Sequence, residues 1–139
     1  MTANAPIRVM IVDDNPRFRE LLRSLLERDD QIAVVGEAEN GDAIVEVTEL
    51  TTPDVVLMDL SMPGVDGLEA TLQLKNRFPG IEVVMLSATD DDHAIGAMLA
   101  GGASRFLHKS TPAAEIVRAL KQGTRSGLPD SAQAPSDTD

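Results

Sequence analysis

Apolar and polar positions alternate along this chain with two different periods. Short runs rich in Val, Ile, Leu and Met, bounded by polar residues, are typical of buried strands. These runs cover residues 7–12, 32–38, 54–60, 81–86 and 104–109. Between them, apolar residues recur every third or fourth position, which indicates amphipathic helices. The predicted helices cover residues 16–29, 41–50, 66–78, 91–102 and 111–123.

Local signals at the helix ends agree with this pattern. Asn15 is a suitable N-cap, and Pro16 suits the first helical position. Thr111 and Pro112 give the last helix the same start. The fourth helix ends in two glycines, a common way to end a helix.

Five strands that alternate with five helices predict an α/β domain. The third and fourth strands are apolar on both faces, as expected when helices cover both sides of a parallel sheet. A doubly wound sheet with right-handed crossovers follows. We expect the domain to span residues 6–123. Residues 124–139 are rich in Pro, Ser, Asp and Ala, which favours a linker or a disordered tail.

Composition limits where and with what this chain works. Its 139 residues suit one domain, and the absence of cysteine favours a reducing compartment. The N-terminus lacks a secretory signal, and no apolar stretch is long enough to cross a bilayer. We therefore expect a soluble cytoplasmic protein. A net charge of −11, with no Trp, no Tyr and three Phe, argues against direct binding of nucleic acid.

Chemistry-bearing residues gather at the ends of the predicted strands. Asp13 and Asp14 follow the first strand, and Asp59 lies at the end of the third. Ser87 follows the fourth strand, and Lys109 ends the fifth. Open α/β sheets bind ligands outside the carboxyl ends of their strands. We therefore expect these five residues to share one pocket.

Three carboxylates at one place need a counter-charge. Carboxylate oxygens are hard ligands, so Mg²⁺ is the expected cation, with Mn²⁺ as a substitute. A metal, Lys109 and Ser87 would together suit a phosphoryl group, which the carboxylate of Asp59 could attack to form an acyl phosphate. The pocket therefore predicts phosphoryl transfer.

Each of these residues also has an ordinary structural explanation. An aspartate after a strand is often a turn residue or a helix cap, and a lysine there is often a solvated charge. The acidic residues at 90–92, next to His93, complement the dipole of a helix start better than they indicate a metal site. His108 is expected to point to the face of its strand opposite to Lys109. Only the joint placement at several strand ends favours a functional site.

Four sequence motifs within about residues 7–123 resemble those of a known family. They are "IVDDN", "VVLMDLSMPGVDGLEA", "VVMLSA" and "GGASRFLHKS". Together they resemble the receiver domain of bacterial two-component response regulators, within the NarL/FixJ group. The resemblance implies a flavodoxin-like three-layer fold with strand order 2-1-3-4-5. It also implies a sensor histidine kinase as phosphoryl donor and a homodimer on phosphorylation.

The resemblance also assigns roles to individual residues. Asp59 would be the phosphoacceptor, Asp14 a direct Mg²⁺ ligand, and Asp13 a ligand nearby or through water. The backbone carbonyl of Ser61 would complete the protein's share of the metal shell. Lys109 would contact the phosphoryl group, and the pair expected to switch would be Ser87 and Phe106.

Some positions depart from the commonest family pattern. Ser61 and Thr89 occupy positions that tune the lifetime of the phosphoryl group in the family, so this lifetime stays open. Ser110 stands where many members have proline after a cis peptide bond, and a cis bond before serine would cost about 3 kcal/mol. Phe106 lacks the hydroxyl of the commoner tyrosine.

Other functions remain to be weighed. Members of this group usually act on transcription through a C-terminal DNA-binding domain, which this chain does not contain. The chain is then either a receiver piece of a transcription factor, which its tail favours, or a stand-alone receiver. A pseudo-receiver that acts without phosphorylation is an alternative. A phosphohydrolase would need a second Asp where Ser61 stands, and a dinucleotide-binding domain would need a Gly-rich turn after the first strand. We expect a signalling phosphoacceptor and not an enzyme with turnover on external substrates.

Overall fold

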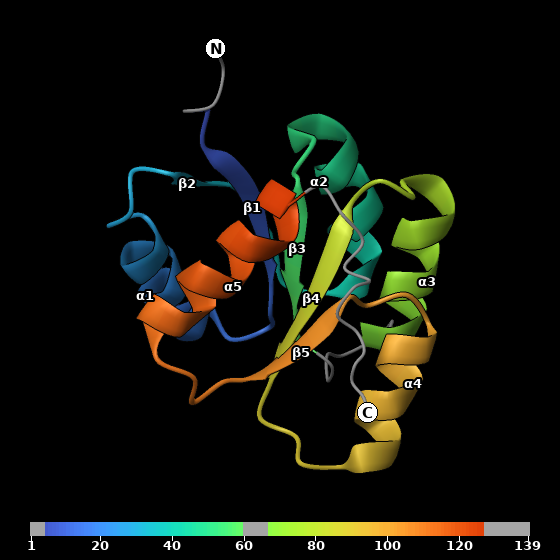
Figure 1. The fold of residues 1–139 in the computed structure, drawn as a ribbon. Helices are drawn as coiled ribbons and strands as arrows, with labels where there is room; N and C mark the ends of the chain where they lie inside the picture. Colours follow the sequence, from blue (N-terminus) through green and yellow to red (C-terminus); the bar gives the residue numbers. More distant parts are fainter. Residues whose placement is uncertain (1–4, 60–66, 127–139) are drawn as a thin grey trace.

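The structure, a computed structural model, describes residues 5–59 and 67–126. In these ranges the chain alternates between strand and helix from one end to the other (Figure 1). The strands are β1 (Ile7–Val12), β2 (Ile32–Ala38), β3 (Val55–Met58), β4 (Glu82–Ser87) and β5 (Arg105–His108). The helices are α1 (Pro16–Leu26), the 3-10 helix η2 (Gly41–Ala43), α2 (Ile44–Thr51), α3 (Gly67–Arg77), α4 (Asp92–Ala100) and α5 (Ala113–Ser126).

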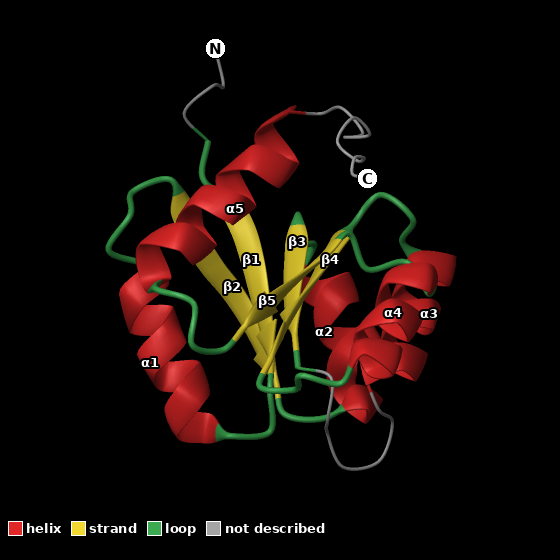
Figure 2. Cartoon of the chain, turned by 60° about the horizontal axis from the view of Figure 1, so that its bottom comes forward, coloured by secondary structure: helices red, strands yellow, loops and turns green. Residues whose placement is uncertain are grey.

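All strands lie parallel in one sheet, in the order β2-β1-β3-β4-β5. This confirms the predicted order 2-1-3-4-5. Helices α1 and α5 cover one face of the sheet, and α2, α3 and α4 cover the other (Figure 2). The molecule therefore has three layers, with the sheet in the middle.

The sheet separates two hydrophobic clusters because successive strand residues point to opposite faces. On β1, Val9 and Ile11 pack toward α1 and α5, where they meet Leu22 and Leu120. The alternate residues Met10 and Val12 pack toward α2, α3 and α4. The central strands are thus apolar on both faces, as predicted for a covered parallel sheet.

The strand ends differ slightly from the predicted ranges, and the polar residues there explain why. β3 is shorter than 54–60 at its start, since Asp54 turns its carboxylate to the backbone N–H of Arg8, at 2.9 Å. β3 also ends earlier than predicted, at Met58, so Asp59 stands just beyond the strand, and residue 60 lies outside the described residues. β4 includes Ser87, and β5 ends at His108, so Lys109 stands just beyond the strand.

The helix ends differ by up to three residues. α1 ends at Leu26 instead of 29, because Asp29 forms a turn by accepting a hydrogen bond from the N–H of Gln31. The predicted helix over 41–50 starts as η2, where the side chain of Asn40 binds two successive backbone N–H groups and tightens the first turn. The predicted start of α3 at residue 66 lies outside the described residues.

The last helix begins later and ends later than predicted. Its first turn is closed by the carbonyl of Pro112, so Ala113 is the first helical residue. It continues through Gly123 to Ser126, so this glycine does not end the helix. A Cβ on Gly123 would lie 2.5 Å from a carboxylate oxygen of Glu82. The division into a domain over 6–123 and a tail over 124–139 stays a prediction, and residues 127–139 lie outside the described part.

Within the described part of the chain, no helix combines the length and the apolar character that crossing a membrane requires. No peptide bond among these residues is cis, so the bond between Lys109 and Ser110 is trans.

Candidate functional site

The predicted site residues converge at the carboxyl ends of neighbouring strands. Asp13 directly follows β1, and its backbone N–H donates to the carbonyl of Ala38 on β2 at 3.0 Å. Asp59 directly follows β3, and its N–H donates to the carbonyl of Val12 at 2.9 Å. The order of the strands therefore places these two aspartates side by side.

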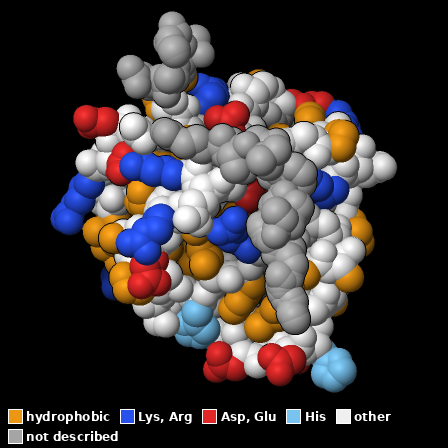
Figure 3. All heavy atoms as spheres, viewed as in Figure 1, with side chains coloured by type: hydrophobic (Ala, Val, Ile, Leu, Met, Phe, Trp, Pro, Cys, Tyr) orange, Lys and Arg blue, Asp and Glu red, His pale blue; other side chains and the backbone are white. Residues whose placement is uncertain are grey.

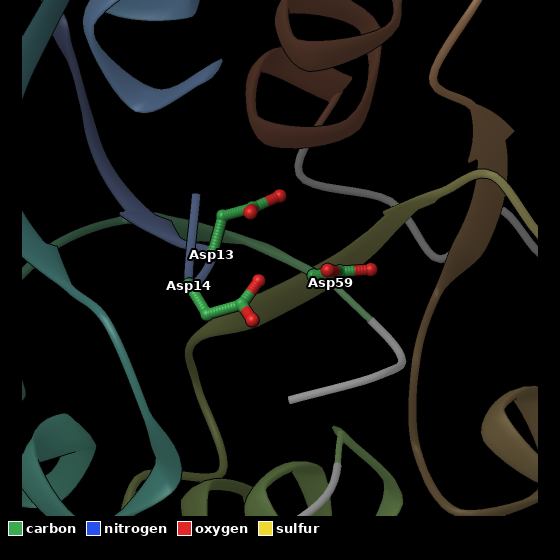
Figure 4. Close-up of side chains that lie close together, drawn as sticks. All are labelled: Asp13, Asp14 and Asp59. Atoms are coloured by element: carbon green, nitrogen blue, oxygen red, sulfur yellow. The ribbon is translucent and has the colours of Figure 1, made fainter. Parts of the chain in front are cut away.

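Three carboxylates form a compact cluster at this edge. Asp13, Asp14 and Asp59 each offer an oxygen atom, and these atoms lie within 4.8 Å of one another. Their side chains extend to the same side of the strand ends (Figure 4). Asp13 and Asp59 are buried, whereas Asp14 is exposed. A set of hard oxygen donors that is open to solvent on one side fits a partly hydrated divalent cation such as Mg²⁺.

Lys109 joins this cluster from the end of β5. Its Nζ lies 2.7 Å from an Oδ atom of Asp13 and 3.6 Å from an Oδ atom of Asp59. Burial by itself lowers the pKa of Lys109, but the hydrogen bond to Asp13 and the charge of Asp59 outweigh it, so the pKa lies above its ordinary 10.5. The lysine therefore stays charged throughout the neutral range, and it is not the solvated loop charge that its position alone would suggest.

Asn15, and not the aspartate pair, caps the following helix. Its side-chain oxygen accepts hydrogen bonds from the backbone N–H groups of Arg17 and Phe18. Asp13 accepts one hydrogen bond from the N–H of Asn15 at 2.9 Å, and its other oxygen contacts Lys109. The turn interpretation thus accounts for only one oxygen of Asp13, and the other faces the cluster.

Ser87 is buried at the end of β4, on the strand between the aspartates and Lys109. Its carbonyl accepts the backbone N–H of Lys109 at 2.9 Å, and its hydroxyl accepts the N–H of Thr89 at 3.4 Å. The hydroxyl of Thr89 accepts in turn from the N–H of Asp91. Phe106 pairs with Met85 in the sheet and lies half-buried against the cluster on the α4 side. Ser61 lies outside the described residues.

The acidic run before α4 has a structural role. Asp91 caps the helix by accepting from the N–H groups of His93 and Ala94, and Asp92 stands in the first turn. His108 lies near Ser110 and Asp90, away from the aspartates that Lys109 contacts. Figure 3 shows acidic and histidine side chains near one another at the lower edge of the molecule.

Sequence reasoning missed two residues of α1 that support the site. The ring centroid of Phe18 lies 4.4 Å from Nζ of Lys109, within the range of a cation–π interaction. The guanidinium of Arg19 donates to the backbone carbonyl of Asp13 at 2.5 Å. Their place in the first turns after the aspartate pair was the available signal, but both also fit an ordinary amphipathic helix.

Known proteins resemble this chain in both sequence and fold. Residues 9–121 match the family described as the response regulator receiver domain. The transcriptional regulatory protein DegU of Brevibacillus brevis is 38% identical over 121 residues, which cover 87% of this chain and 51% of DegU. The nitrate/nitrite response regulator NarL of Escherichia coli (strain K12) is 32% identical over 122 residues, which cover 88% of this chain and 56% of NarL. The chain thus spans about half the length of these curated relatives.

A solved structure agrees with this. The crystal structure of a two-component response regulator of the LuxR family from Aurantimonas sp. SI85-9A1 matches with a TM-score of 0.82 at 33% identity. The match covers 93% of this chain and 94% of that chain. The strand order, the aspartate cluster and these similarities lead to one conclusion. This chain belongs to the response regulator receiver domain family of two-component signalling, and its relatives are regulators of the NarL type.

Proposed function

We propose that Asp59 accepts a phosphoryl group from the phosphohistidine of a sensor kinase. One carboxylate oxygen attacks phosphorus, the bond between phosphorus and the donor nitrogen breaks, and an acyl phosphate forms on Asp59. The observation that carries this proposal is the contact of Lys109 with two carboxylates that belong to a three-carboxylate cluster. An aspartate kept for packing alone would not need this set of charges.

The neighbouring residues have separate tasks in this proposal. Asp13, Asp14 and Asp59, with the backbone carbonyl of Ser61, would hold Mg²⁺, or Mn²⁺ in its place. The bound cation would neutralise charge on the phosphoryl oxygens during transfer. Lys109 lies close enough to Asp59 to pair with a phosphoryl oxygen once the group is attached. The same groups would support self-catalysed loss of the phosphoryl group, at a rate tuned at Ser61 and Thr89.

The hydroxyl of Ser87 is the proposed sensor of the modified state. It would donate a hydrogen bond to the new phosphoryl group, and Phe106 on the next strand would then repack on the α4 side. Phosphorylation would act by shifting the population of two conformations and would not create a new one.

The proposed output is transcription, through a DNA-binding domain outside this chain. The matched residues make up only 51% of DegU, which is named a transcriptional regulatory protein. With a net charge of −11, the receiver itself is a poor ligand for DNA. We also propose a cytoplasmic location and self-association on phosphorylation. A helix-turn-helix segment in the gene beyond codon 139 would support the transcriptional output, and an immediate stop codon would favour a stand-alone receiver.

The direct test is phosphorylation by acetyl phosphate in the presence of Mg²⁺, followed by intact-mass measurement. Wild type should gain one phosphoryl group, and Asp59→Asn should gain none. Asp54→Asn is the matched control, because Asp54 flanks the other end of β3, where its carboxylate accepts a hydrogen bond from the backbone N–H of Arg8. It should be phosphorylated like wild type.

Two outcomes would overturn the proposal. Phosphorylation that persists in Asp59→Asn would place the acceptor elsewhere. A wild type that binds Mg²⁺ but gains no phosphoryl group would favour a pseudo-receiver that acts by protein contact alone.

A further inference from the structure

Each of the two peptide groups that flank the Cα atom of Asp13 is held by a hydrogen bond. The backbone N–H of Asp13 donates to the carbonyl of Ala38 on β2. Its carbonyl oxygen accepts a hydrogen bond from Nη1 of Arg19 on α1, at 2.5 Å. The second bond fixes the plane of the peptide that leads directly to the exposed carboxylate of Asp14.

Arg19 is itself held in place. Its Nε donates to one carboxylate oxygen of Glu37 on β2, at 2.9 Å, and its side chain is only 14% exposed. Glu37 is in register with Ile11, two residues before Asp13. The guanidinium is a rigid fork, so a bond at one end sets the direction of the other. Glu37 thus aims Arg19 at the carbonyl of Asp13.

We propose that Arg19 is a positioning residue for the cation site. By fixing the peptide between Asp13 and Asp14, it holds the carboxylate of Asp14 where it can share a cation with Asp59. This inference rests on the proposed function, because it requires that the carboxylate cluster binds a divalent cation. Partners behind metal ligands commonly act in this way, and their loss typically weakens metal binding by about 10–100-fold.

The chain offers a matched control in Arg23, one turn further along α1. Arg23 donates to the second carboxylate oxygen of the same Glu37, at 2.6 Å. Its other contacts are the carbonyl of Val34, at 3.3 Å, and the carboxylate of Glu27, at 3.7 Å, and not the carbonyl of Asp13. Arg19→Gln and Arg23→Gln therefore both remove a charged partner of Glu37, but only Arg19→Gln releases the carbonyl of Asp13.

The experiment titrates Mn²⁺ into the full chain and follows free Mn²⁺ by electron paramagnetic resonance, with Mg²⁺ as competitor. Arg19→Gln should bind Mn²⁺ about tenfold or more weakly than wild type. Arg23→Gln should bind like wild type. Thermal unfolding without metal should show a similar loss in both variants, since each loses one bond to Glu37. Arg19→Lys keeps the charge but lacks the fork, so it should not restore binding.

Several results would overturn the inference. Wild-type affinity in Arg19→Gln would show that the bond to Asp13 does not position the site. An equal loss of Mn²⁺ affinity in Arg19→Gln and Arg23→Gln would show that the effect comes from a general destabilisation. If Arg19→Gln does not fold, Arg19→Lys decides, and wild-type affinity in it would count against the role. A wild type that binds no Mn²⁺ would overturn the proposed cation site as well, so the two failures are distinguishable.

Discussion

Lys109 supplies one positive charge to two buried carboxylates. It contacts Asp13 more closely than Asp59, at 2.7 Å against 3.6 Å, and the ring of Phe18 lies beside its ammonium. A buried carboxylate that loses its partner is costly, because it can neither ionise nor stay neutral without a penalty. The residues proposed to carry the chemistry therefore also contribute to the stability of the fold.

Lys109→Met should destabilise the protein and make its stability depend on Mg²⁺. Without metal, we expect the free energy of unfolding to fall by about 1–3 kcal/mol, because two carboxylates lose a shared partner. Added Mg²⁺ should restore part of this loss by replacing the missing charge. Chemical denaturation with and without Mg²⁺ measures both effects.

Lys121→Met is the control for this prediction. Lys121 pairs with Asp29 between α5 and the end of α1, and neither residue belongs to the carboxylate cluster. Lys121→Met should lower the free energy of unfolding by less than Lys109→Met does, and Mg²⁺ should not change this difference from wild type. Equal Mg²⁺ responses in the two variants would contradict the role given to Lys109.

Glu37 should make stability depend on pH on the acid side. Burial by itself raises the pKa of Glu37, but the hydrogen bonds from Arg23 and Arg19 outweigh it and hold the pKa below its ordinary 4.5. A lowered pKa means that the stabilisation is fully present above pH 4.5 and is lost as the pH falls through the lower folded value. Glu37→Gln should therefore be less stable than wild type at neutral pH, and the two curves should converge in acid. A constant difference in unfolding free energy at all pH values would contradict this.

At the scale of elements, α4 combines weak packing with a strict C-terminal turn. Only Met98 of this helix is buried, whereas Gly96 lies on an open surface. The helix ends at Ala100 and is followed by Gly101, its C-cap, and by Gly102, which has a φ of 122°. A Cβ on Gly101 would lie 2.7 Å from Leu68 of α3. α4 is thus loosely packed along its length and tightly packed at its C-terminal turn.

Two alanine substitutions should separate these properties. Gly96→Ala should raise the free energy of unfolding by about 0.5–1 kcal/mol, because it restricts the unfolded chain and meets no atom within 4 Å. Gly102→Ala should lower it by about 1–2 kcal/mol, because the residue would be strained at positive φ and would meet Lys75 at 2.8 Å. Thermal unfolding of both variants checks the signs. A stabilised Gly102→Ala would contradict the account of this turn.

At the scale of the molecule, β4 and β5 connect the carboxylate cluster to the α4 side. Ser87 is buried at the end of β4, and Phe106 on β5 packs against the cluster that contains Met85 and Met98. On the other side of β5, Leu107 packs with α1 and α5. A shift of β5 would therefore change the packing of both hydrophobic clusters.

Ser87→Ala should separate phosphorylation from its consequence. Asp59 should still accept a phosphoryl group, because the proposed nucleophile is its own carboxylate. The gain in self-association on phosphorylation, which is about 5–150-fold for coupled sites of ordinary strength, should be reduced. Sedimentation velocity before and after treatment with acetyl phosphate measures it.

Ser104→Ala is the control on the opposite end of the same strands, where the hydroxyl of Ser104 donates to Glu82. It should change neither the phosphorylation nor the association. Full self-association in phosphorylated Ser87→Ala would remove Ser87 from the switch.

The sequence predicted the fold and the residues at the strand ends, but not the neighbouring residues that hold them in place. Asp59 and Lys109 could be found because parallel strands bring their carboxyl ends together, whatever the side-chain packing. Arg19 could not be found, since an arginine among helix surface residues gives no sign of which carbonyl it will bind. The extent of α5 was missed because Gly123 looks like a helix end and is in fact a point of close contact with Glu82.

β5 differs from the other strands in its exposure. It is an edge strand that pairs only with β4, and all four of its residues are half-buried, while β3 is fully buried. Amide protons of such a strand should exchange with solvent through small local openings, well before the central strands exchange. We expect hydrogen–deuterium exchange to show this gradient in the unmodified protein. Phosphorylation would then shift the population of a local opening of β5 that already occurs in the unmodified protein, and the packing of the central strands would stay intact.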